Sequence, residues 1–566
     1  MSDFRTILLS ALCALTVSAQ GAFAAGAFDR AHKGAEGQPA TAQAKEAKAD
    51  PSAEAAVGRL SPVSDFPQGE FTVNISDHFP DWRPYKAYNA DEAQILTAVY
   101  EGLFVYDPWN MDPIPALAES WTVSDDGLVW TFRIRKGAEF ETGEPITAGI
   151  IRASWLNLLN PALGAPYGSL LDPIKGAADY RNGVEKDPEK VGIACPDDAT
   201  LVVSLVTPTA HLPKILCHHA FSAVHPSRLA APEVTEKTVP VSSGPYRVES
   251  VTADGIRFVK NEHYWDRDRV AIPAINLIVS SDAEAISDRF NRGEINWLGG
   301  SVLVDRILDP HSIHVTPMFS TEYFYFRSIR GPWTDSRVRN ALLLAIPWSE
   351  LRADYLIPAT TLVFPIAGYP EFKGLEKQDI DGAKKLLAEA GYGEGHPMDT
   401  VVIRIPESDA FMKLATTLKG AWDKIGLKVD IKSLPANEYY GTLRNDDYSV
   451  AITSWIGDFA DPLAFLEMFR PKSSLNDSGW NNADFEALIV DAAAQKDIKA
   501  RYAKLAEAEK LLLAQGVIIP IAHNPALNVI DLNGLAGWYT NPLDVHPFKF
   551  IRFVPAKPLP GVALLP

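Results

Sequence analysis

Cysteine, excess positive charge and the short motifs of common enzymes are scarce or missing in this chain of 566 residues. The nucleophile elbow G-x-S-x-G, the zinc-binding pair H-E-x-x-H and the Walker phosphate loop do not occur. One glycine-rich stretch, GYGEG, follows an expected helix and not a strand, which disfavours a dinucleotide site. We therefore expect a protein that is not an enzyme and needs no cofactor.

Acidic residues outnumber basic ones. Asp and Glu together number 71 and Lys and Arg 53, so that the formal net charge is -18. Proteins that bind nucleic acid generally present a basic surface, so we expect no nucleic-acid partner. The charge suits a soluble secreted protein.

The first 24 residues have the pattern of a secretory signal peptide. Arg5 supplies a positive charge, ILLSALCALTVSA is a short apolar core, and AFA at 22–24 fits the small-x-small cleavage rule. The apolar run is shorter than the roughly 18 residues of a membrane span. We expect cleavage and release. A retained anchor or a lipid on Cys13 is the alternative, although Leu12 does not suit lipid attachment.

The next segment, residues 25–68, is rich in Ala, Lys, Glu, Gln, Gly and Pro and has few large apolar residues. Such a segment cannot repay the entropy of ordering, and we expect a flexible leader. From about residue 69 the composition becomes globular and rich in aromatic residues. A remainder of about 500 residues is long enough for roughly three domains.

Cys195 and Cys217 are the cysteines outside the expected signal peptide. In an oxidising compartment they form a candidate disulfide, although the sequence does not show whether their Cβ atoms approach each other. A metal site is the alternative, built from Cys217, His218 and His219 with His211 or Cys195. Adjacent histidines on a helix point in different directions and no second close ligand pair exists, so we expect no metal.

Apolar periodicity predicts alternating strands and helices. Residues 71–76 have the pattern of a strand, 147–160 that of an amphipathic helix, and the turn at 125–127 lies between two strands of a hairpin. In the final third, the strands VVIRI, LKVDIK, YSVAITSW and VIIPIA alternate with helical segments. This order predicts an α/β fold with a largely parallel sheet.

Two aspartates follow the strand YSVAITSW. Asp461 directly precedes a proline and an apolar run, which predicts a helix N-cap. Asp458 has no such local role. Ligands of open α/β sheets bind beyond the carboxyl ends of strands, so Asp458 is a candidate binding residue, and a solvated loop residue is the alternative. The neighbouring rings of Trp455, Phe459 and Tyr440 belong either to the core or to a cleft.

Taken together, these segments resemble the family 5 extracellular solute-binding proteins, which are peptide-binding components of ABC importers. The resemblance spans about residues 70–555 and rests on the order of several motifs: ILTAVYEGLFVYD, PALAESW, VWTFRIRKGAEFETGEPITAGIIRASWLNLLNP, SSGPYRV, VKNEHYW, RGEIN, DSRVRNALLLAI, KKLLAEAGY, WIGDFADP and VIIPIAHN.

The resemblance implies a bilobed periplasmic binding protein fold of type II, cluster C, with an extra subdomain. Lobe I would comprise residues 69–100, 242–319 and 526–566, the inserted subdomain 101–241, and lobe II 320–525. Because the chain crosses between the lobes more than once, we expect a hinge that closes over the ligand.

The resemblance also gives Asp458 a role. In peptide-binding members, the aspartate of the W-x-x-D loop pairs with the ligand's α-ammonium group, and Trp455-Ile456-Gly457-Asp458 matches that loop. A carboxylate in a closed cleft makes a strong charge-assisted bond to an ammonium group. The ligand backbone would bind as an added strand, with side chains in hydrated pockets. We expect Trp455, Gly457, Phe459 and Tyr440 to lie at the same site.

The sequence departs from the family pattern where relatives hold the ligand's carboxylate. Ile452 stands where well-known peptide binders have an arginine, and Phe411 where some have a histidine. Arg404 and Arg444 are candidate substitutes, and surface arginines with no binding role are the alternative. Either the site that holds the ligand's carboxylate is therefore rebuilt, or the ligand's C-terminus is not clamped.

The function that the resemblance implies is capture of oligopeptides in the periplasm and delivery to a permease and ATPase in the inner membrane. The protein is expected to act as a monomer. Other members bind nickel complexes, haem, sugars or opines, and a cargo of that kind is the alternative. A surface adhesin or a signalling receptor using the same cleft is a further one.

Overall fold

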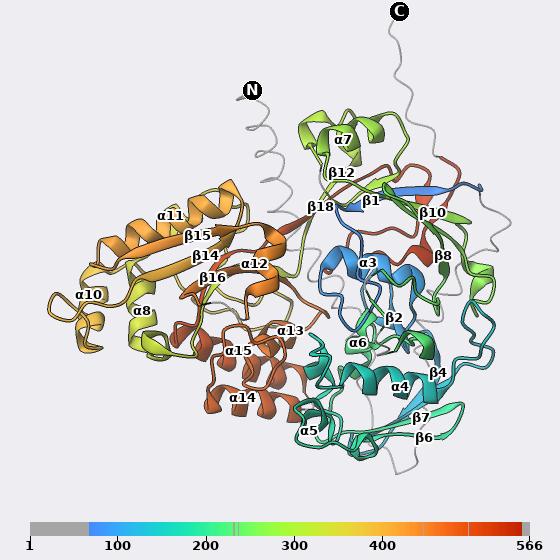
Figure 1. Cartoon of the computed structure of the whole chain (residues 1–566), viewed down its shortest axis with the longest axis horizontal. Coiled ribbons are helices and arrows are strands. Elements are labelled where there is room, and N and C mark those ends of the chain that lie inside the picture. Colours follow the sequence, from blue (N-terminus) through green and yellow to red (C-terminus); the bar gives the residue numbers. More distant parts are fainter. Residues whose placement is uncertain are drawn as a thin grey trace, which may run out of the picture.

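The computed structural model describes residues 67–229, 233–235, 237–300, 302–444, 447–495 and 497–556. The expected signal peptide and nearly all of the expected leader lie outside this part of the chain. The described residues form a mixed α/β protein with strands in five sheets, three of which have four or more strands. Figure 1 shows the five-stranded sheet and its helices on one side of the molecule and the other two large sheets on the opposite side.

The largest sheet has seven strands in the order β12-β18-β11-β1-β10-β9-β8. Its central strand β1 confirms the predicted strand at 71–76 and pairs in parallel with β10 and β11. Alternate side chains of β1, Phe71, Val73 and Ile75, enter one apolar core. The strands are β1 (Phe71–Ser76), β8 (Tyr246–Val251), β9 (Gly255–Lys260), β10 (Ala274–Val279), β11 (Trp297–Leu298), β12 (Ile313–Pro317) and β18 (Pro525–Ile530).

The five-stranded sheet has the order β15-β14-β16-β13-β17. β14 pairs in parallel with β15 and β16, as the strand–helix alternation predicts. β13 pairs antiparallel with both β16 and β17, so this strand alone runs in the opposite direction and the sheet is mixed. The strands are β13 (Ser320–Phe326), β14 (Val401–Pro406), β15 (Val429–Leu434), β16 (Val450–Ile456) and β17 (Ile518–Ala522).

The four-stranded sheet is antiparallel, with the order β4-β5-β7-β6. The predicted hairpin is present, and Gly127 in its turn has a positive φ of 73° that suits glycine. Trp155 of the helix α4 is fully buried and donates its indole N–H to Phe221 O at 2.9 Å. The elements are β4 (Ala118–Val123), β5 (Val129–Ile134), β6 (Ile193–Asp197), β7 (Thr200–Ser204) and α4 (Ala148–Leu158).

Helices cover the sheets, and the longest of those described, α15, has 17 residues. No helix in the described ranges combines the length and the apolar character needed to cross a bilayer. Besides α4, the α-helices are α3 (Ala90–Val99), α5 (Ala177–Arg181), α6 (Leu212–Ile215), α7 (Ala283–Asn291), α8 (Ser336–Ala345), α9 (Trp348–Leu351), α10 (Ile380–Glu389), α11 (Asp409–Asp423), α12 (Ala436–Thr442), α13 (Leu463–Leu466), α14 (Ala483–Ala494) and α15 (Ile498–Ala514).

Short elements complete the described fold. They include two pairs of short strands, β2 with β3 and β19 with β20. Their bounds are β2 (Phe104–Tyr106), β3 (Pro113–Pro115), β19 (Leu535–Ala536) and β20 (Arg552–Phe553). The single-turn helices are η2 (Gly168–Leu171), η3 (Pro188–Lys190), η4 (His219–Phe221), η5 (Pro226–Arg228), η6 (Arg267–Arg269), η7 (Val304–Arg306), η8 (Pro310–Ser312), η9 (Gly331–Thr334), η10 (Glu467–Phe469) and η11 (Phe548–Phe550).

Two short segments join the seven-stranded sheet to the five-stranded sheet. β12 ends at Pro317 and β13 begins at Ser320, while β17 ends at Ala522 and β18 begins at Pro525. Ser320 donates its hydroxyl to Asn524 O at 3.0 Å, which ties the two crossings together. This arrangement suits a hinge. The exact boundaries predicted for two lobes and an inserted subdomain remain a prediction.

The predicted disulfide is absent, because Cys195 and Cys217 are both free thiols. Cys195 lies on β6, at the edge of the four-stranded sheet. Cys217 follows α6 and donates its thiol to Pro213 O at 3.4 Å, within its own segment. The prediction was wrong because the number of cysteines does not determine the direction in which each side chain points.

Candidate functional site

The loop that follows β16 is fixed at its first residue by a close backbone approach. Gly457 N–H donates to Phe319 O at 2.8 Å. A Cβ atom at position 457 would lie 2.4 Å from a ring carbon of Phe319, closer than any normal contact. Glycine is therefore required here, and this packing determines where the next residue, Asp458, lies.

The Asp458 carboxylate is buried without a cationic partner. Its side chain is 6% exposed, and its Oδ2 atom has no hydrogen-bond partner. Its Oδ1 atom lies 3.8 Å from Nε2 of His218, and in the described part of the chain no lysine or arginine forms an ion pair with it. Burial, and then the charge of Glu467, raise the pKa of Asp458 well above its ordinary value. A cation brought to this carboxylate would relieve a large desolvation penalty.

Aromatic rings surround this carboxylate. The Tyr88 ring centroid lies 6.0 Å from that of Trp455 and 6.2 Å from that of Tyr167. Tyr167 lies in turn 4.3 Å from the His218 ring. Burial first, and then neighbouring charges that include Asp458, raise the pKa values of the Tyr88 and Tyr167 hydroxyls, so both rings stay neutral. The neighbouring rings are therefore uncharged, and their electron-rich faces also favour a cation.

The backbone of the Asp458 loop is held by residues of β2 and α6. Tyr106, at the end of β2, donates its hydroxyl to Asp458 O at 2.7 Å. Lys214 of α6 lies 3.4 Å from Ala460 O in the same loop. Asp458 thus follows a strand of the five-stranded sheet, whereas the residues that hold its loop belong to distant segments of the chain.

Asp461 has the opposite electrostatic character. Both of its carboxylate oxygens accept hydrogen bonds from Arg501, at 2.6 and 2.9 Å. Burial alone would raise the pKa of Asp461, but the Arg501 guanidinium outweighs burial and the pKa lies below its usual value. Asp461 Oδ1 also accepts from Leu463 N at 3.0 Å, although the capping position is Pro462, one residue later than predicted. Asp461 is therefore mainly half of a buried ion pair.

A second buried carboxyl group, Glu467, lies near Asp458. Burial raises the pKa of Glu467 to about 7, although Arg470 at 3.1 Å opposes this shift. Arg470 also binds Glu486 at 2.6 Å. In its ionised form, Glu467 adds negative potential at Asp458.

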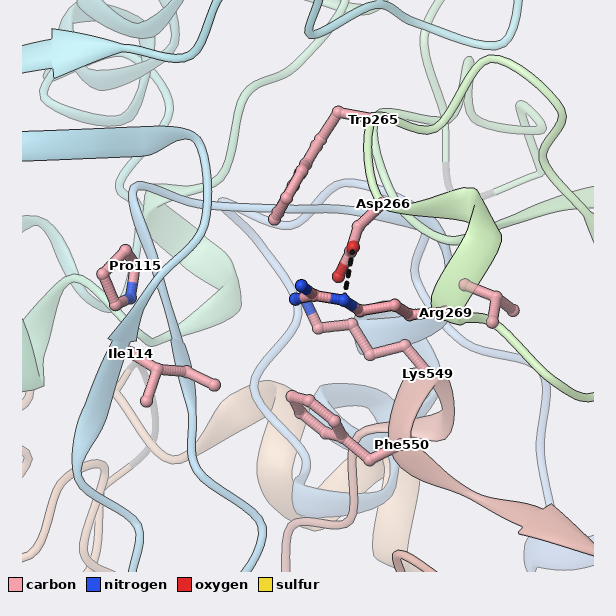
Figure 2. Close-up of a pocket in the computed structure, with 8 residues that line it drawn as sticks. Ile114, Pro115, Trp265, Asp266, Arg269, Lys549 and Phe550 are labelled. Atoms are coloured by element: carbon pink, nitrogen blue, oxygen red, sulfur yellow. Dashed lines mark ion pairs between the residues drawn. The ribbon is translucent and has the colours of Figure 1, made fainter. Parts of the chain in front are cut away.

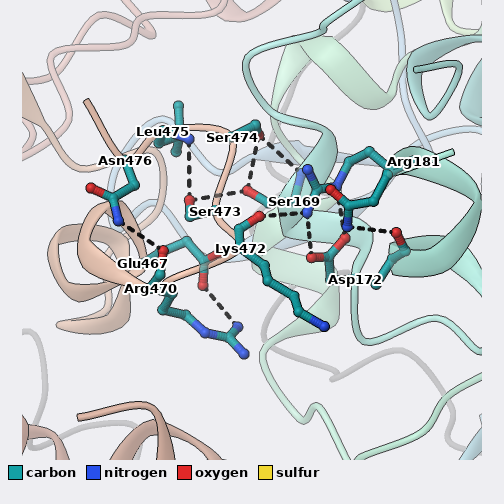
Figure 3. A network of polar contacts seen from close by, with 12 residues as sticks. Ser169, Asp172, Arg181, Glu467, Arg470, Lys472, Ser473, Ser474, Leu475 and Asn476 are labelled. Atoms are coloured by element: carbon teal, nitrogen blue, oxygen red, sulfur yellow. Dashed lines mark hydrogen bonds and ion pairs between the residues drawn. The ribbon is translucent and has the colours of Figure 1, made fainter. Parts of the chain in front are cut away.

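The loop after η10 also contacts residues between 166 and 181, on η2, α5 and the loop before them (Figure 3). Ser474 donates its hydroxyl to Pro166 O at 2.5 Å and accepts from Ser169 N at 3.3 Å. Arg181 donates to Lys472 O at 2.7 Å. We call these five residues the Ser474 contact. It joins two segments that are distant in the sequence, and its hydrogen bonds do not include the Asp458 carboxylate.

A cavity lies where β1 and β11 end and β18 begins, beside the crossing segments. Its volume is about 490 Å³, and its lining includes Trp297, Ile456 and the three carboxylates of Asp77, Asp91 and Asp544. Two of these carboxylates lie near His78, which is 3.0 Å from Asp77 and 3.6 Å from Asp91. Ile456 belongs to the W-x-x-D loop, so this cavity and the Asp458 site adjoin the same strand end.

A second, smaller cavity of about 20 Å³ is lined by Trp265, Arg269 and Lys549, among other residues (Figure 2). It has room for about one water molecule. Lys549 lies 3.5 Å from Glu101 and 5.6 Å from the centre of the Trp265 ring. These contacts link Glu101, which precedes β2, to Lys549 near the C-terminal end of the described chain. The cavity is too small for a solute.

The structure places the other predicted site residues as follows. Trp455 is buried, donates its indole N–H to Ala464 O at 3.0 Å, and lies beside Tyr88 near Asp458. Phe459 is buried against His211, at 6.0 Å between ring centroids, and belongs to the core. Tyr440 is 52% exposed and acts on the Tyr88 hydroxyl electrostatically, so it lies at the rim of the same region.

The two candidate arginines differ. Arg404 is only 2% exposed, lies between the rings of Tyr439 and Tyr448, and donates to the hydroxyl of Thr442. Arg444 is half exposed and binds Asp477 at 2.7 Å. Of the two, Arg444 alone is accessible enough to meet a ligand.

Ile452 is buried in the five-stranded sheet, opposite Phe324 in the ladder. Phe411 is partly buried against the apolar core. Neither side chain offers a group that binds a carboxylate. The structure therefore has no carboxylate-binding side chain at these two positions.

Sequence reasoning missed four residues of the site: Tyr88, Tyr106, Tyr167 and His218. His218 attracted attention only as a metal ligand, and the described residues contain no cluster of three or more potential metal ligands. Tyr106 lies 352 positions before Asp458 in the chain. No local pattern marks such residues, and only the chain topology brings them together.

Comparisons with known proteins agree with this architecture. The model of the bacterial extracellular solute-binding proteins, family 5 middle region, matches residues 112–477. The periplasmic oligopeptide-binding protein OppA of Escherichia coli (strain K12) is 29% identical, over 81% of this chain and 88% of its own length. The periplasmic murein peptide-binding protein MppA of the same strain is 27% identical, over 82% and 90%. The probable deoxycholate-binding periplasmic protein YgiS, again from that strain, is also 27% identical over 82% and 90%.

Solved structures of MppA add information on the arrangement of the lobes. One structure of this murein tripeptide binding protein aligns with a TM-score of 0.76 at 26% identity and covers 86% of this chain and 99% of MppA. The unliganded open form of MppA aligns with a TM-score of only 0.62. The chain therefore has the bilobed family fold in an arrangement unlike that open form, and it belongs to family 5 of the bacterial extracellular solute-binding proteins, a family of solute binders and not of enzymes.

Proposed function

We propose that this protein captures oligopeptides in the periplasm by their α-ammonium group and delivers them to an ABC permease and ATPase of the inner membrane. The observation that carries the proposal is the buried Asp458 carboxylate, whose Oδ2 atom has no partner. A ligand ammonium would provide the missing charge and three N–H donors. The α-ammonium group is common to peptides of every sequence, so one anchor serves many cargoes.

The relatives support the peptide cargo. OppA and MppA are named for binding oligopeptides and murein peptides, and both align over more than 80% of this chain. Both are periplasmic proteins, which agrees with the signal-peptide pattern of the first 24 residues. Docking on a permease as a monomer with a closed cleft completes the proposed role.

The proposal is tested by calorimetry with trialanine and trilysine, each with a free and an acetylated amino terminus. We expect Asp458→Ala to weaken binding of the free tripeptides by about 2–5 kcal/mol, the usual cost of removing one member of a buried charge pair. The acetylated peptides should bind poorly to the wild type, because they lack the α-ammonium group. Equal affinity for the free and acetylated forms contradicts the anchor role of Asp458.

A second candidate cargo is a cationic molecule other than a peptide. Ile452 and Phe411 leave no carboxylate-binding group at the family positions, so a ligand with an amine but no carboxylate fits equally well. Native mass spectrometry of protein purified without refolding distinguishes the two candidates by the mass of the co-purified cargo.

A further inference from the structure

The His218 ring is held with one nitrogen turned toward Asp458. Its Nδ1 atom accepts a hydrogen bond from Ala220 N at 3.3 Å, where η4 begins. The ring is 93% buried, between Tyr167 at 4.3 Å and His219 at 4.1 Å. Because Nδ1 is the acceptor, the neutral ring carries its proton on Nε2, the atom that faces Asp458 Oδ1 at 3.8 Å.

We propose that His218 is a positioning residue for ligand capture: its Nε2–H directs Oδ1 of Asp458 and leaves Oδ2 free for the ammonium group of the cargo. The inference rests on the proposed function. The separation of 3.8 Å exceeds that of a direct hydrogen bond, so the ring acts as an oriented dipole and not as a competing partner.

This pair spans two parts of the molecule. Asp458 follows β16 of the five-stranded sheet, whereas His218 lies between α6 and η4, beside the four-stranded sheet. Tyr106 also reaches the Asp458 loop from that side. Movement of these parts away from each other would separate the ring from the carboxylate. Recognition of the ammonium is thus completed by the same closure that buries it.

Separation of the two parts also changes the protonation of the ring. In the closed structure burial, and then His219, lower the pKa of His218, so that the ring is neutral. Once exposed to water, an imidazole takes up a proton near its ordinary pKa of about 6.5. The titratable groups around it are Asp458, Tyr167, His219 and the adjacent Cys217, with Glu467 beyond Asp458.

His218 that is protonated in the separated state has to be neutral when the two parts close over the ligand. Ligand binding must then release this proton, so the affinity falls as the pH drops below about 6.5. Above that pH the ring is already neutral in both states, and the affinity becomes independent of this group. The expected loss between about pH 7 and pH 5.5 is close to tenfold.

Two substitutions separate the donor from the charge. His218→Gln keeps an N–H donor that does not titrate, and His218→Leu removes the donor. With trialanine at about pH 7, near which its amine is still largely protonated, we expect His218→Gln to bind within about threefold of the wild type and His218→Leu at least about tenfold more weakly. The affinity of His218→Gln should stay nearly constant down to about pH 5.5. The control His219→Gln, changed at the neighbouring ring, should retain the wild-type pH dependence.

The outcomes separate this inference from the proposed function. If acetylated trialanine binds the wild type as tightly as free trialanine, the proposed function fails. If only the free form binds, but His218→Leu matches the wild type at neutral pH and retains the loss of affinity at low pH, the positioning role alone is overturned. Circular dichroism establishes that each variant folds. Should His218→Leu not fold, the pH profile of His218→Gln still decides: a flat profile supports the role and a wild-type profile refutes it.

Discussion

At the scale of single residues, two aspartates three positions apart in one loop have opposite electrostatic roles. Arg501 neutralises Asp461 through two hydrogen bonds, whereas Asp458 has no cation among the described residues. Removing one partner of a buried pair such as Asp461–Arg501 is generally costly for folding. An unpaired buried carboxylate lowers stability unless a ligand pairs with it. Asp461 maintains the loop, and Asp458 makes the loop specific for a cation.

Another buried carboxyl group, Glu509, gives a test of stability against pH. Its oxygens accept hydrogen bonds from the N–H groups of Leu362 and Val363, both at 2.8 Å, and from the Tyr369 hydroxyl at 2.7 Å. Burial nevertheless raises the pKa of Glu509 to about 7. Between the unfolded value of about 4.3 and this folded value, the folded protein binds more protons, so stability falls as the pH rises.

The substitution Glu509→Gln should remove this pH dependence. Relative to the variant, the wild type is expected to lose about 1–3 kcal/mol of unfolding free energy between about pH 5 and pH 8. Urea unfolding at the two pH values measures the difference. Glu119→Gln, at an exposed position on β4, is the control and should show no such change. A parallel pH dependence of wild type and Glu509→Gln counts against a raised pKa.

At the scale of secondary-structure elements, the connection from β16 to α13 depends on one glycine. A methyl group at Gly457 would meet the Phe319 ring at 2.4 and 2.7 Å, so that the ring or the loop has to move. We expect Gly457→Ala to lower the unfolding free energy by about 1–3 kcal/mol, as overpacking does. It should also reduce tripeptide affinity, because Asp458 moves with the loop.

The matched control is Gly420→Ala in α11, where an added methyl group meets no atom within 4 Å. That change should stabilise the helix by about 0.5–1 kcal/mol. Thermal unfolding and calorimetry of both variants make the comparison. If Gly457→Ala behaves like Gly420→Ala, the loop tolerates the methyl group and does not set the position of the carboxylate.

Elements with strong local patterns were predictable from the sequence, whereas the contacts between them were not. β1 and the hairpin of β4 and β5 match their predictions because apolar alternation and turn residues are local signals. The reversed direction of β13 depends on where the chain crosses between sheets, which periodicity does not encode. In the site, Asp458 and Trp455 were found through a compact motif. Tyr106 and His218 were not, because they reach the loop from distant parts of the chain.

At the scale of the whole molecule, the arrangement of the parts determines whether the site is complete. The open form of MppA aligns less well than its other structure, with TM-scores of 0.62 and 0.76. The buried Asp458 and the Ser474 contact are both features of a closed arrangement in this chain. Ligand binding and closure are therefore coupled, and contacts that favour closure raise the affinity for every ligand.

The Ser474 contact tests this coupling because Ser474 forms no hydrogen bond with the Asp458 carboxylate. Ser474→Ala removes the hydrogen bonds to Pro166 O and Ser169 N, each worth about 0.5–1.5 kcal/mol. We expect the dissociation constants of trialanine and trilysine to rise by the same factor, about fivefold to 150-fold, since the change affects closure and not ligand contacts. Small-angle scattering should show a smaller closed fraction at equal ligand concentration. Ser124→Ala, in the exposed turn between β4 and β5, should leave both measurements unchanged. Unequal effects on the two tripeptides would mean that Ser474 contacts the cargo, because a shift in a shared closing equilibrium cannot discriminate between ligands.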